Sequence, residues 1–238
     1  MSMDVGAKVQ KFYLDQLGLL QPSNIELPEV GQPQYPSRWS DISTMTISYG
    51  HGISVSPLQL AGAVGTLVNG GKRIPPSLLK QRTLEPPTGI RVISEKTSLQ
   101  MRELMHLAVK NGTGKKAAAQ GYLVGGKTAT AEKQVNGGYK KQSLRSSFVG
   151  AFPIDNPRFV ILAMLDEPKG TEQTSNYATG GWVAAPIVSR LVSRIAALLG
   201  ILPRSTETPS NELRVVKPRI ALLSLKPISG GGHHSAAF

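Results

Sequence analysis

The amino-acid sequence predicts an α+β domain in which helices pack on an antiparallel sheet. Helical patterns come first: several segments carry apolar residues at three- and four-residue spacing or begin with a helix cap. Strand patterns follow, and two apolar runs separated by a short turn predict a hairpin. With 238 residues and 40% hydrophobic content, the chain is long enough for one such domain with a hydrophobic core.

The first half of the chain predicts two helices joined by a connector. Apolar residues at helical spacing predict a helix from Asp4 to about Leu19. Residues 22–39 hold four prolines and no periodicity, which is typical of an irregular surface connector. Ser56-Pro57 has the sequence of an N-cap followed by proline at the first helical position, and the helix after it should end near Gly70-Gly71.

The second half predicts a third helix and then the sheet. Ser94 should cap a helix that reaches about Lys110. Strands are expected from Lys127 onward, over 146–152 and over 159–165, the last two separated by a turn signal. The last strand is apolar throughout, so both its faces should be covered, one of them by a closing helix over 180–192.

The stretch Gly125-Gly126-Lys127-Thr128-Ala129-Thr130 predicts a strand that holds a ligand. In an extended strand Lys127 and Ala129 point to one side, and Thr128 and Thr130 to the other. A cation attracts a carboxylate, hydroxyls donate hydrogen bonds to it, and small neighbours let the ligand approach. The alternative from these residues alone is an edge strand that carries Lys and Thr for solubility and strand propensity.

The string GGKTATAEK, residues 125–133, resembles the Lys-Thr-Gly strand of penicillin-binding proteins and serine β-lactamases. Residues 38–71, 146–170 and 180–192 resemble, in order, the segments around that strand in class B penicillin-binding proteins, and are most similar to the division-specific septal transpeptidase of alphaproteobacteria. The resemblance runs from about residue 4 to 203, and the sequence is identified as a member of this family. It implies the family's transpeptidase fold, here without its N-terminal strands and nucleophile helix.

The resemblance also implies a mechanism for a complete member of the family. A serine attacks the penultimate D-alanine carbonyl of a stem peptide, D-alanine leaves, and an amine of a second peptide resolves the acyl-enzyme into a cross-link. β-Lactams mimic the D-alanyl-D-alanine end. Lys127 would supply positive charge, Thr128 and Thr130 would hold the carboxylate, and the backbone of Ala129 would align the peptide as an added strand. No metal or cofactor is implied.

Three departures from the family pattern matter. Ala129 stands where the family has glycine, and its methyl group would narrow the cleft. The nucleophilic Ser-x-x-Lys motif is matched by Ser77-Leu78-Leu79-Lys80 alone, which follows a helix instead of opening one and is therefore expected to be a chance match. Ser2-Met3-Asp4 imitates the family's Ser-x-Asn motif, but the favoured register reads this segment as the helix after that motif.

Three functions follow from these departures. The first is the C-terminal part of a septal peptidoglycan transpeptidase, from a split or truncated reading frame and inactive alone. The second is a non-catalytic interaction module that binds division partners or complements an N-terminal fragment, favoured if missing strands leave a sheet edge open. The third, a self-contained serine β-lactamase, requires Ser77 as nucleophile.

Other polar residues have structural interpretations. His51, a loop histidine between glycines, is expected to be structural rather than an acid or base. Asp166 and Glu167 are adjacent at a strand end, so they should point apart and belong to a turn. Glu132 and Lys133 are expected to be a solvated continuation of the motif strand. Four histidines and no cysteine offer no zinc spacing.

The net charge of +12 does not predict a nucleic-acid partner, because Lys and Arg occur as scattered pairs and aromatic residues make up only 5%. Basic character also suits anionic lipids and cell-wall precursors. No signal peptide is expected, because Met1 is followed by an amphipathic stretch with Asp4 and Lys8. No membrane span is expected either, since Arg190 and Arg194 interrupt the most apolar segment, 182–202. The resemblance implies an inner-membrane anchor upstream and a periplasmic domain.

Residues 1–203 should form the domain, followed by a mostly disordered tail, 204–238, with one weak docking strand.

Overall fold

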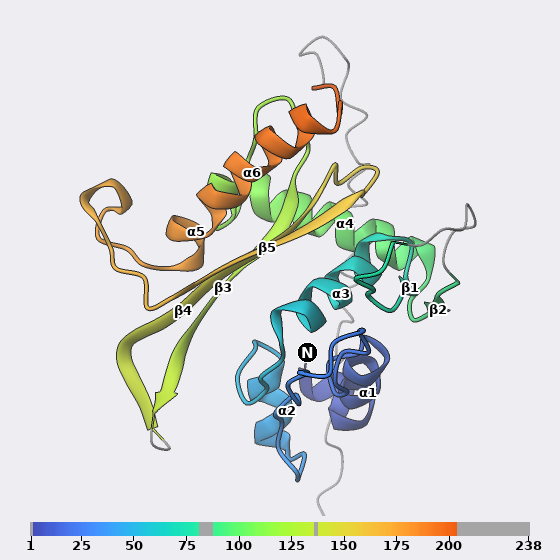
Figure 1. The fold of residues 1–238 in the computed structure, drawn as a ribbon. Coiled ribbons are helices and arrows are strands. Elements are labelled where there is room, and N and C mark those ends of the chain that lie inside the picture. Colours follow the sequence, from blue (N-terminus) through green and yellow to red (C-terminus); the bar gives the residue numbers. More distant parts are fainter. Residues whose placement is uncertain (1, 81–87, 136–137, 204–238) are drawn as a thin grey trace, which may run out of the picture.

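A three-stranded antiparallel sheet organises the molecule. The computed structural model describes residues 2–80, 88–135 and 138–203. The strands β3 (Gly125–Val135), β4 (Gly138–Phe152) and β5 (Phe159–Asp166) lie in the order β3-β4-β5. Helix α6 (Ala185–Leu198) runs along one face of the sheet, while α3 (Pro57–Val68) and α4 (Glu95–Lys110) lie on the other (Figure 1). The α+β prediction is confirmed.

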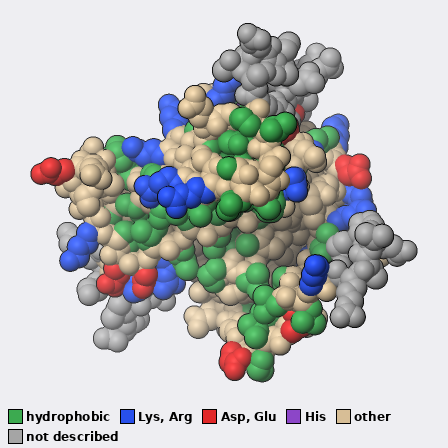
Figure 2. Space-filling model, turned by 45° about the horizontal axis from the view of Figure 1, so that its top comes forward, with side chains coloured by type: hydrophobic (Ala, Val, Ile, Leu, Met, Phe, Trp, Pro, Cys, Tyr) green, Lys and Arg blue, Asp and Glu red, His purple; other side chains and the backbone are tan. Residues whose placement is uncertain are grey.

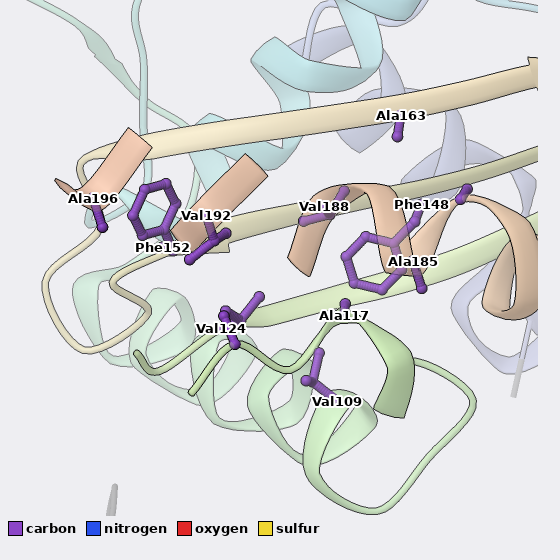
Figure 3. Close-up of a cluster of buried hydrophobic side chains, with 12 residues drawn as sticks. Val109, Ala117, Val124, Phe148, Phe152, Ala163, Ala185, Val188, Val192 and Ala196 are labelled. Carbon is purple, nitrogen blue, oxygen red and sulfur yellow. The ribbon is translucent and has the colours of Figure 1, made fainter. Parts of the chain in front are cut away.

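The larger hydrophobic core lies between the sheet and α6. Phe148 and Phe152 of β4 are fully buried and point toward α6, where Val188 and Val192 meet them (Figure 3). Ala163 of β5 packs in the same cluster. Because alternate side chains of a strand point to opposite faces, these residues form a continuous apolar surface under one helix.

A second core lies on the opposite face of the same strands. Val149 and Ala151 of β4 pack there with Val64 of α3 and Met105 of α4. Val160 and Leu162 of β5 join this cluster, while Phe159, Ile161 and Ala163, which alternate with them, join the first. The prediction that the last strand is covered on both faces is confirmed, although Met164, near its end, is 45% exposed.

Two predicted helix starts have the caps that the sequence indicates. Ser56 and Gln59 form a capping box: Ser56 Oγ accepts from the Gln59 amide at 3.2 Å, and the Ser56 amide donates to Gln59 Oε1 at 2.9 Å. Ser94 Oγ accepts from the Thr97 amide at 3.1 Å. These bonds satisfy amide groups that a helix N-terminus leaves without partners, so local chemistry alone sets both starts.

The N-terminal region differs from its prediction. Helix α1 (Ser2–Gln16) is interrupted at Gly6, where φ is 76°, and ends before the predicted Leu19. None of its residues is buried, so its apolar side chains have no core to enter. Helix α2 (Asp41–Ile47), capped by Ser40, was not predicted, because seven residues are too few for a recognisable apolar period. The short strands β1 (Lys72–Arg73) and β2 (Ile90–Arg91) were also not predicted.

The closing helix consists of two parts, α5 (Gly180–Val183) and α6. By length and composition alone, 180–198 could cross a membrane, which the sequence analysis did not expect. Arg190 and Arg194 lie on its exposed side, while Val188 and Val192 are buried against the sheet. In this fold the segment therefore serves as a core helix.

The surface and the C-terminus complete the description. Figure 2 shows Lys and Arg side chains in separate groups, with hydrophobic side chains between them, on the face that it presents. The described residues therefore form no continuous basic stripe on that face. The predicted tail, 204–238, with its weak docking strand, lies outside the described residues.

Candidate functional site

The candidate ligand-binding strand, β3, occupies an edge of the sheet. Its inner side pairs with β4, placing Lys127 opposite Val149, Thr128 opposite Phe148 and Thr130 opposite Ser146. Among the described residues no strand pairs with its outer side. An edge strand can pair through its outer N–H and C=O groups with an extended peptide, which would add as a further strand.

The glycine pair that opens β3 serves packing. Gly125 and Gly126 are buried, and a Cβ atom on Gly126 would lie 2.4 Å from Phe148 Cζ. A Cβ atom on Gly125 would lie 2.6 Å from Ile154 Cγ1. The sequence interpretation, that small neighbours let a ligand approach, does not apply to these two glycines, because core side chains already fill the space.

Lys127 reaches around the strand toward Thr128. Its side chain is exposed, and Nζ donates to the Thr128 carbonyl at 2.9 Å and to Thr128 Oγ1 at 3.4 Å. Strand alternation puts the two Cβ atoms on opposite faces. The long lysine side chain nevertheless brings its ammonium group to within 3.4 Å of the Thr128 hydroxyl.

Thr128 and Thr130 point to the α5 side of the sheet, and both are held there. Thr128 Oγ1 and Thr113 Oγ1 share a hydrogen bond of 2.8 Å. The Gly180 amide donates to Thr130 Oγ1 at 3.0 Å. A hydroxyl that accepts one hydrogen bond still has its own proton to donate, so Thr130 remains able to bind an anionic oxygen.

These hydroxyl groups line a cavity of about 380 Å³, which we name the threonine cleft. Its lining comes from the segment after α4, from β3 and from the start of α5: Thr113, Lys115, Lys116, Thr128, Thr130, Thr179, Gly181 and Trp182. Hydroxyl and ammonium groups supply most of its polar side chains, and no carboxylate is among the lining residues. The cleft is therefore suited to an anion.

A second cavity of about 520 Å³, the histidine cleft, lies beside the far half of β3. It is lined by Gln34, Tyr35, residues 50–54, residues 131–133 and Arg145. His51, which the sequence predicts to be structural, stands on this wall with its ring 5.6 Å from that of Tyr49. The sequence did not predict that His51 and Glu132 line the same cavity, because about 80 residues separate them in the chain. The resemblance of the segment around His51 to the family was the only sequence signal for a site there.

The carboxylates at the end of β5 do not point apart as predicted. Lys133 Nζ donates to Asp166 Oδ2 at 3.0 Å and to Glu167 Oε1 at 3.1 Å. Glu167 has a φ of 50°, which breaks the strand alternation and turns its side chain back. The hydrogen bonds that Lys133 donates to Asp166 and Glu167 raise its pKa. Lys133 is therefore an ion-paired residue, not the solvated one expected.

Ser77 lies on an exposed, irregular segment rather than at the start of a helix. Its Oγ donates to Glu26 Oε1, and the Leu78 amide donates to Glu26 Oε2 at 2.9 Å. The hydrogen bond from Ser77 lowers the pKa of the Glu26 carboxyl group. Because no helix brings Lys80 one turn below Ser77, the structure agrees with a chance match. Ser2 is the first residue of α1, which is interrupted at Gly6.

Comparison with known proteins places these features in context. Residues 1–193 match the model of the penicillin-binding protein transpeptidase domain. The chain is 40% identical, over 92% of its length, to the probable peptidoglycan D,D-transpeptidase FtsI of Caulobacter vibrioides. It is 36% identical, over 82% of its length, to the stage V sporulation protein D of Bacillus subtilis. The chain spans 39% and 31% of those two relatives, respectively.

Solved structures share the fold. The transpeptidase domain of penicillin-binding protein 3 from Burkholderia pseudomallei matches with a TM-score of 0.77 and 34% identity, over 87% of this chain and 61% of that one. Penicillin-binding protein 3 from Mycobacterium tuberculosis, in complex with ampicillin, matches with a TM-score of 0.77 and 29% identity, over 87% of this chain and 49% of that one. The described sheet and helices thus correspond to part of a larger domain in these structures.

Proposed function

Because the chain belongs to the penicillin-binding protein transpeptidase family, we propose that it forms the substrate-holding part of a septal peptidoglycan D,D-transpeptidase. The observation that carries this proposal is the meeting of the Lys127 ammonium with the Thr128 hydroxyl, 3.4 Å apart, on an open sheet edge. A D-alanyl-D-alanine ligand needs a site for its terminal carboxylate and a sheet edge for its extended backbone, and the proposed site offers both.

In this proposal each motif residue has one role. Thr128 and Thr130 donate hydrogen bonds to the carboxylate, and Lys127 supplies positive charge beside them. The backbone at Ala129 pairs with the peptide as an added strand. β-Lactams would occupy the same place, and the Mycobacterium tuberculosis relative with ampicillin bound supports this ligand class. The chemistry of the complete cycle is acyl transfer from a serine to an amine of a second peptide.

We propose further that these 238 residues hold the substrate without supplying the nucleophile. The only Ser-x-x-Lys string in them is Ser77 to Lys80, whose hydroxyl is bound to Glu26 and whose segment is irregular. A nucleophilic serine needs a partner base at hydrogen-bonding distance and a position beside the ligand, and Ser77 lines neither cleft of β3. Acyl transfer would therefore require a serine from outside these residues.

The test combines covalent labelling with reversible binding. The purified chain, shown to melt cooperatively, is incubated with a fluorescent penicillin and analysed by intact mass. We expect no covalent adduct, and a reversible NMR titration in which N-acetyl-D-alanyl-D-alanine binds more tightly than its C-terminal amide. The Thr128→Val variant should lose this preference. An adduct on Ser77, or equal binding of acid and amide by the wild-type chain, would contradict the proposal.

A second candidate function is an interaction module, because apolar side chains lie exposed on the helices away from the sheet. Val5 and Phe12 of α1 are 52% and 56% exposed, and Ile42 of α2 is 69% exposed. Such a group of exposed apolar residues on neighbouring helices is typical of a surface that another polypeptide covers. We propose the preceding part of a transpeptidase domain as that partner, which also suits the two edges of the sheet that no described strand covers.

Size-exclusion chromatography with a separately made N-terminal part of the Caulobacter relative's domain tests this candidate. We expect the chain and the fragment to co-elute, and we expect the Phe12→Ser variant to lose this co-elution. Leu198→Ser is the matched control, because this side chain is 84% exposed on a different helix. If the chain elutes as a monodisperse monomer and does not bind the fragment, the interaction-module function is contradicted.

The remaining proposals concern boundaries and location. We propose that residues 1–203 belong to the transpeptidase domain and 204–238 lie outside it, which the family match to residue 193 supports. Limited proteolysis should then cut beyond 203 first. We also propose that the domain works in the periplasm beside the inner membrane, as the resemblance implies, and membrane fractionation would test this.

A further inference from the structure

We propose that Lys116, assisted by Lys115, is a specificity-determining residue that supplies a second cation, in addition to Lys127, for a carboxylate bound in the threonine cleft. The inference rests on the proposed function and adds a partner that the motif strand does not contain. Both lysines belong to the short helix η1 (Lys115–Ala117), which precedes β3. Their side chains are exposed and line the cleft opposite Thr128 and Thr130.

The position of the Lys116 ammonium is determined by an aromatic neighbour. Lys116 Nζ lies 4.1 Å from the ring centroid of Trp182, a cation–π contact. Trp182 is stacked in turn on Tyr177, with ring centroids 5.3 Å apart. Since Trp182 and Lys116 both line the cleft, the ring holds the charge over the cavity instead of letting it extend into solvent.

The backbone that carries these lysines is also held in place. Ala117 is fully buried in the core beneath α6, and Ser189 Oγ donates to the Ala118 carbonyl at 2.6 Å. On the other side, Gly114 is so close to the core that a Cβ atom there would lie 3.1 Å from Phe148 Cε2. A charge on a rigid support loses less entropy when it binds a ligand, which favours a binding role over a purely solvating one.

Lys127 supplies its charge from beside this cleft and not from within its lining. Its ammonium group already donates to the Thr128 carbonyl at 2.9 Å, and its side chain does not line the cavity. A carboxylate that accepts hydrogen bonds from Thr128 and Thr130 on the α5 side therefore faces η1 and Trp182. Because the lining contains no acidic residue, nothing within the cleft neutralises Lys115 and Lys116.

The proposal is tested by comparing an acid with its amide on the purified, cooperatively melting chain. NMR titration with N-acetyl-D-alanyl-D-alanine should show binding about five- to tenfold weaker in Lys116→Met than in wild type, as expected for one exposed charge-assisted contact. Binding of the C-terminal amide should change less than about twofold. Lys116→Arg should restore acid binding, and 0.5 M salt should shrink the difference between wild type and Lys116→Met.

The control variant is Lys110→Met, which removes the same charge from an exposed site at the end of α4, outside the cleft. Equal weakening by Lys110→Met, or equal loss of amide binding in Lys116→Met, would overturn the proposal, because net charge or packing on Trp182 would then explain the effect. If Thr128→Val abolishes the acid preference while Lys116→Met leaves it unchanged, the lysine role fails and the proposed function stands. If wild type shows no acid preference, both fail.

Discussion

The backbone amide of Gly180 donates a hydrogen bond to Thr130 Oγ1 over 3.0 Å, joining the first turn of α5 to the candidate binding strand. The approach is close: a Cβ atom on Gly180 would lie 2.2 Å from the Ser147 carbonyl oxygen and 2.5 Å from that of Ala129. Glycine is therefore the residue that lets α5 lie directly on both strands. The geometry of the hydroxyl groups in the threonine cleft depends on this contact.

Replacing Gly180 with alanine should separate α5 from the strands. The new methyl group meets two backbone oxygens that cannot rotate away, so we expect a loss of about 1 to 3 kcal/mol in the free energy of unfolding. Denaturant unfolding measures this loss of free energy. Gly62→Ala is the control, because its Cβ would meet nothing within 4 Å on α3 and should stabilise by about 0.4 to 1 kcal/mol. Equal effects of both variants would contradict the packing argument.

Thr130 should show two separable roles. Thr130→Val leaves the buried Gly180 amide without an acceptor, which should cost about 1 to 3 kcal/mol of stability and also weaken binding of N-acetyl-D-alanyl-D-alanine. Thr130→Ser keeps the hydroxyl group and should retain most of both properties. Thermal melting and NMR titration measure them separately. A valine variant of wild-type stability would show that the amide has found another partner.

Ala129 should limit ligand approach more than it supports the fold. Its side chain is exposed on β3, so Ala129→Gly should cost only about 0.5 to 1 kcal/mol, through added freedom of the unfolded chain. Removal of the methyl group should strengthen binding of the dipeptide, because the backbone becomes more accessible. Ala131→Gly, two residues along the same exposed strand, should lose similar stability without gaining affinity. Weaker binding by Ala129→Gly would contradict this role.

The Lys133 ion pairs should stabilise the fold up to alkaline pH. The hydrogen bonds that Lys133 donates to Asp166 and Glu167 raise its pKa in the folded state. Its contribution to stability is therefore fully present below the unfolded pKa of about 10.4 and is lost as pH rises through the folded pKa. The difference in unfolding free energy between wild type and Lys133→Met should therefore be constant from pH 7 to about 10 and decrease above it. Urea melts across this range measure it, and a difference that grows above pH 10 would refute the assignment.

Much of the fold could be predicted where local chemistry decides it. Ser56 and Ser94 cap their helices through residues three positions away, and the alternation in β3 sets the faces of Lys127 and Thr128. Prediction failed where distant contacts decide. Helix α2 is too short to carry a period, and Glu167 turns back toward Lys133 because of a backbone angle that its position in the sequence does not reveal.

By itself the sequence determined the family, the order of the main helices and strands, and the motif that a carboxylate would meet. These depend on short-range patterns and on a resemblance that is written in the residues. Only the tertiary structure decided which groups share a cleft, because those contacts join segments far apart in the chain. In the folded chain, Thr113 meets Thr128 and Lys116 meets Trp182, beside the core that α6 forms with the sheet.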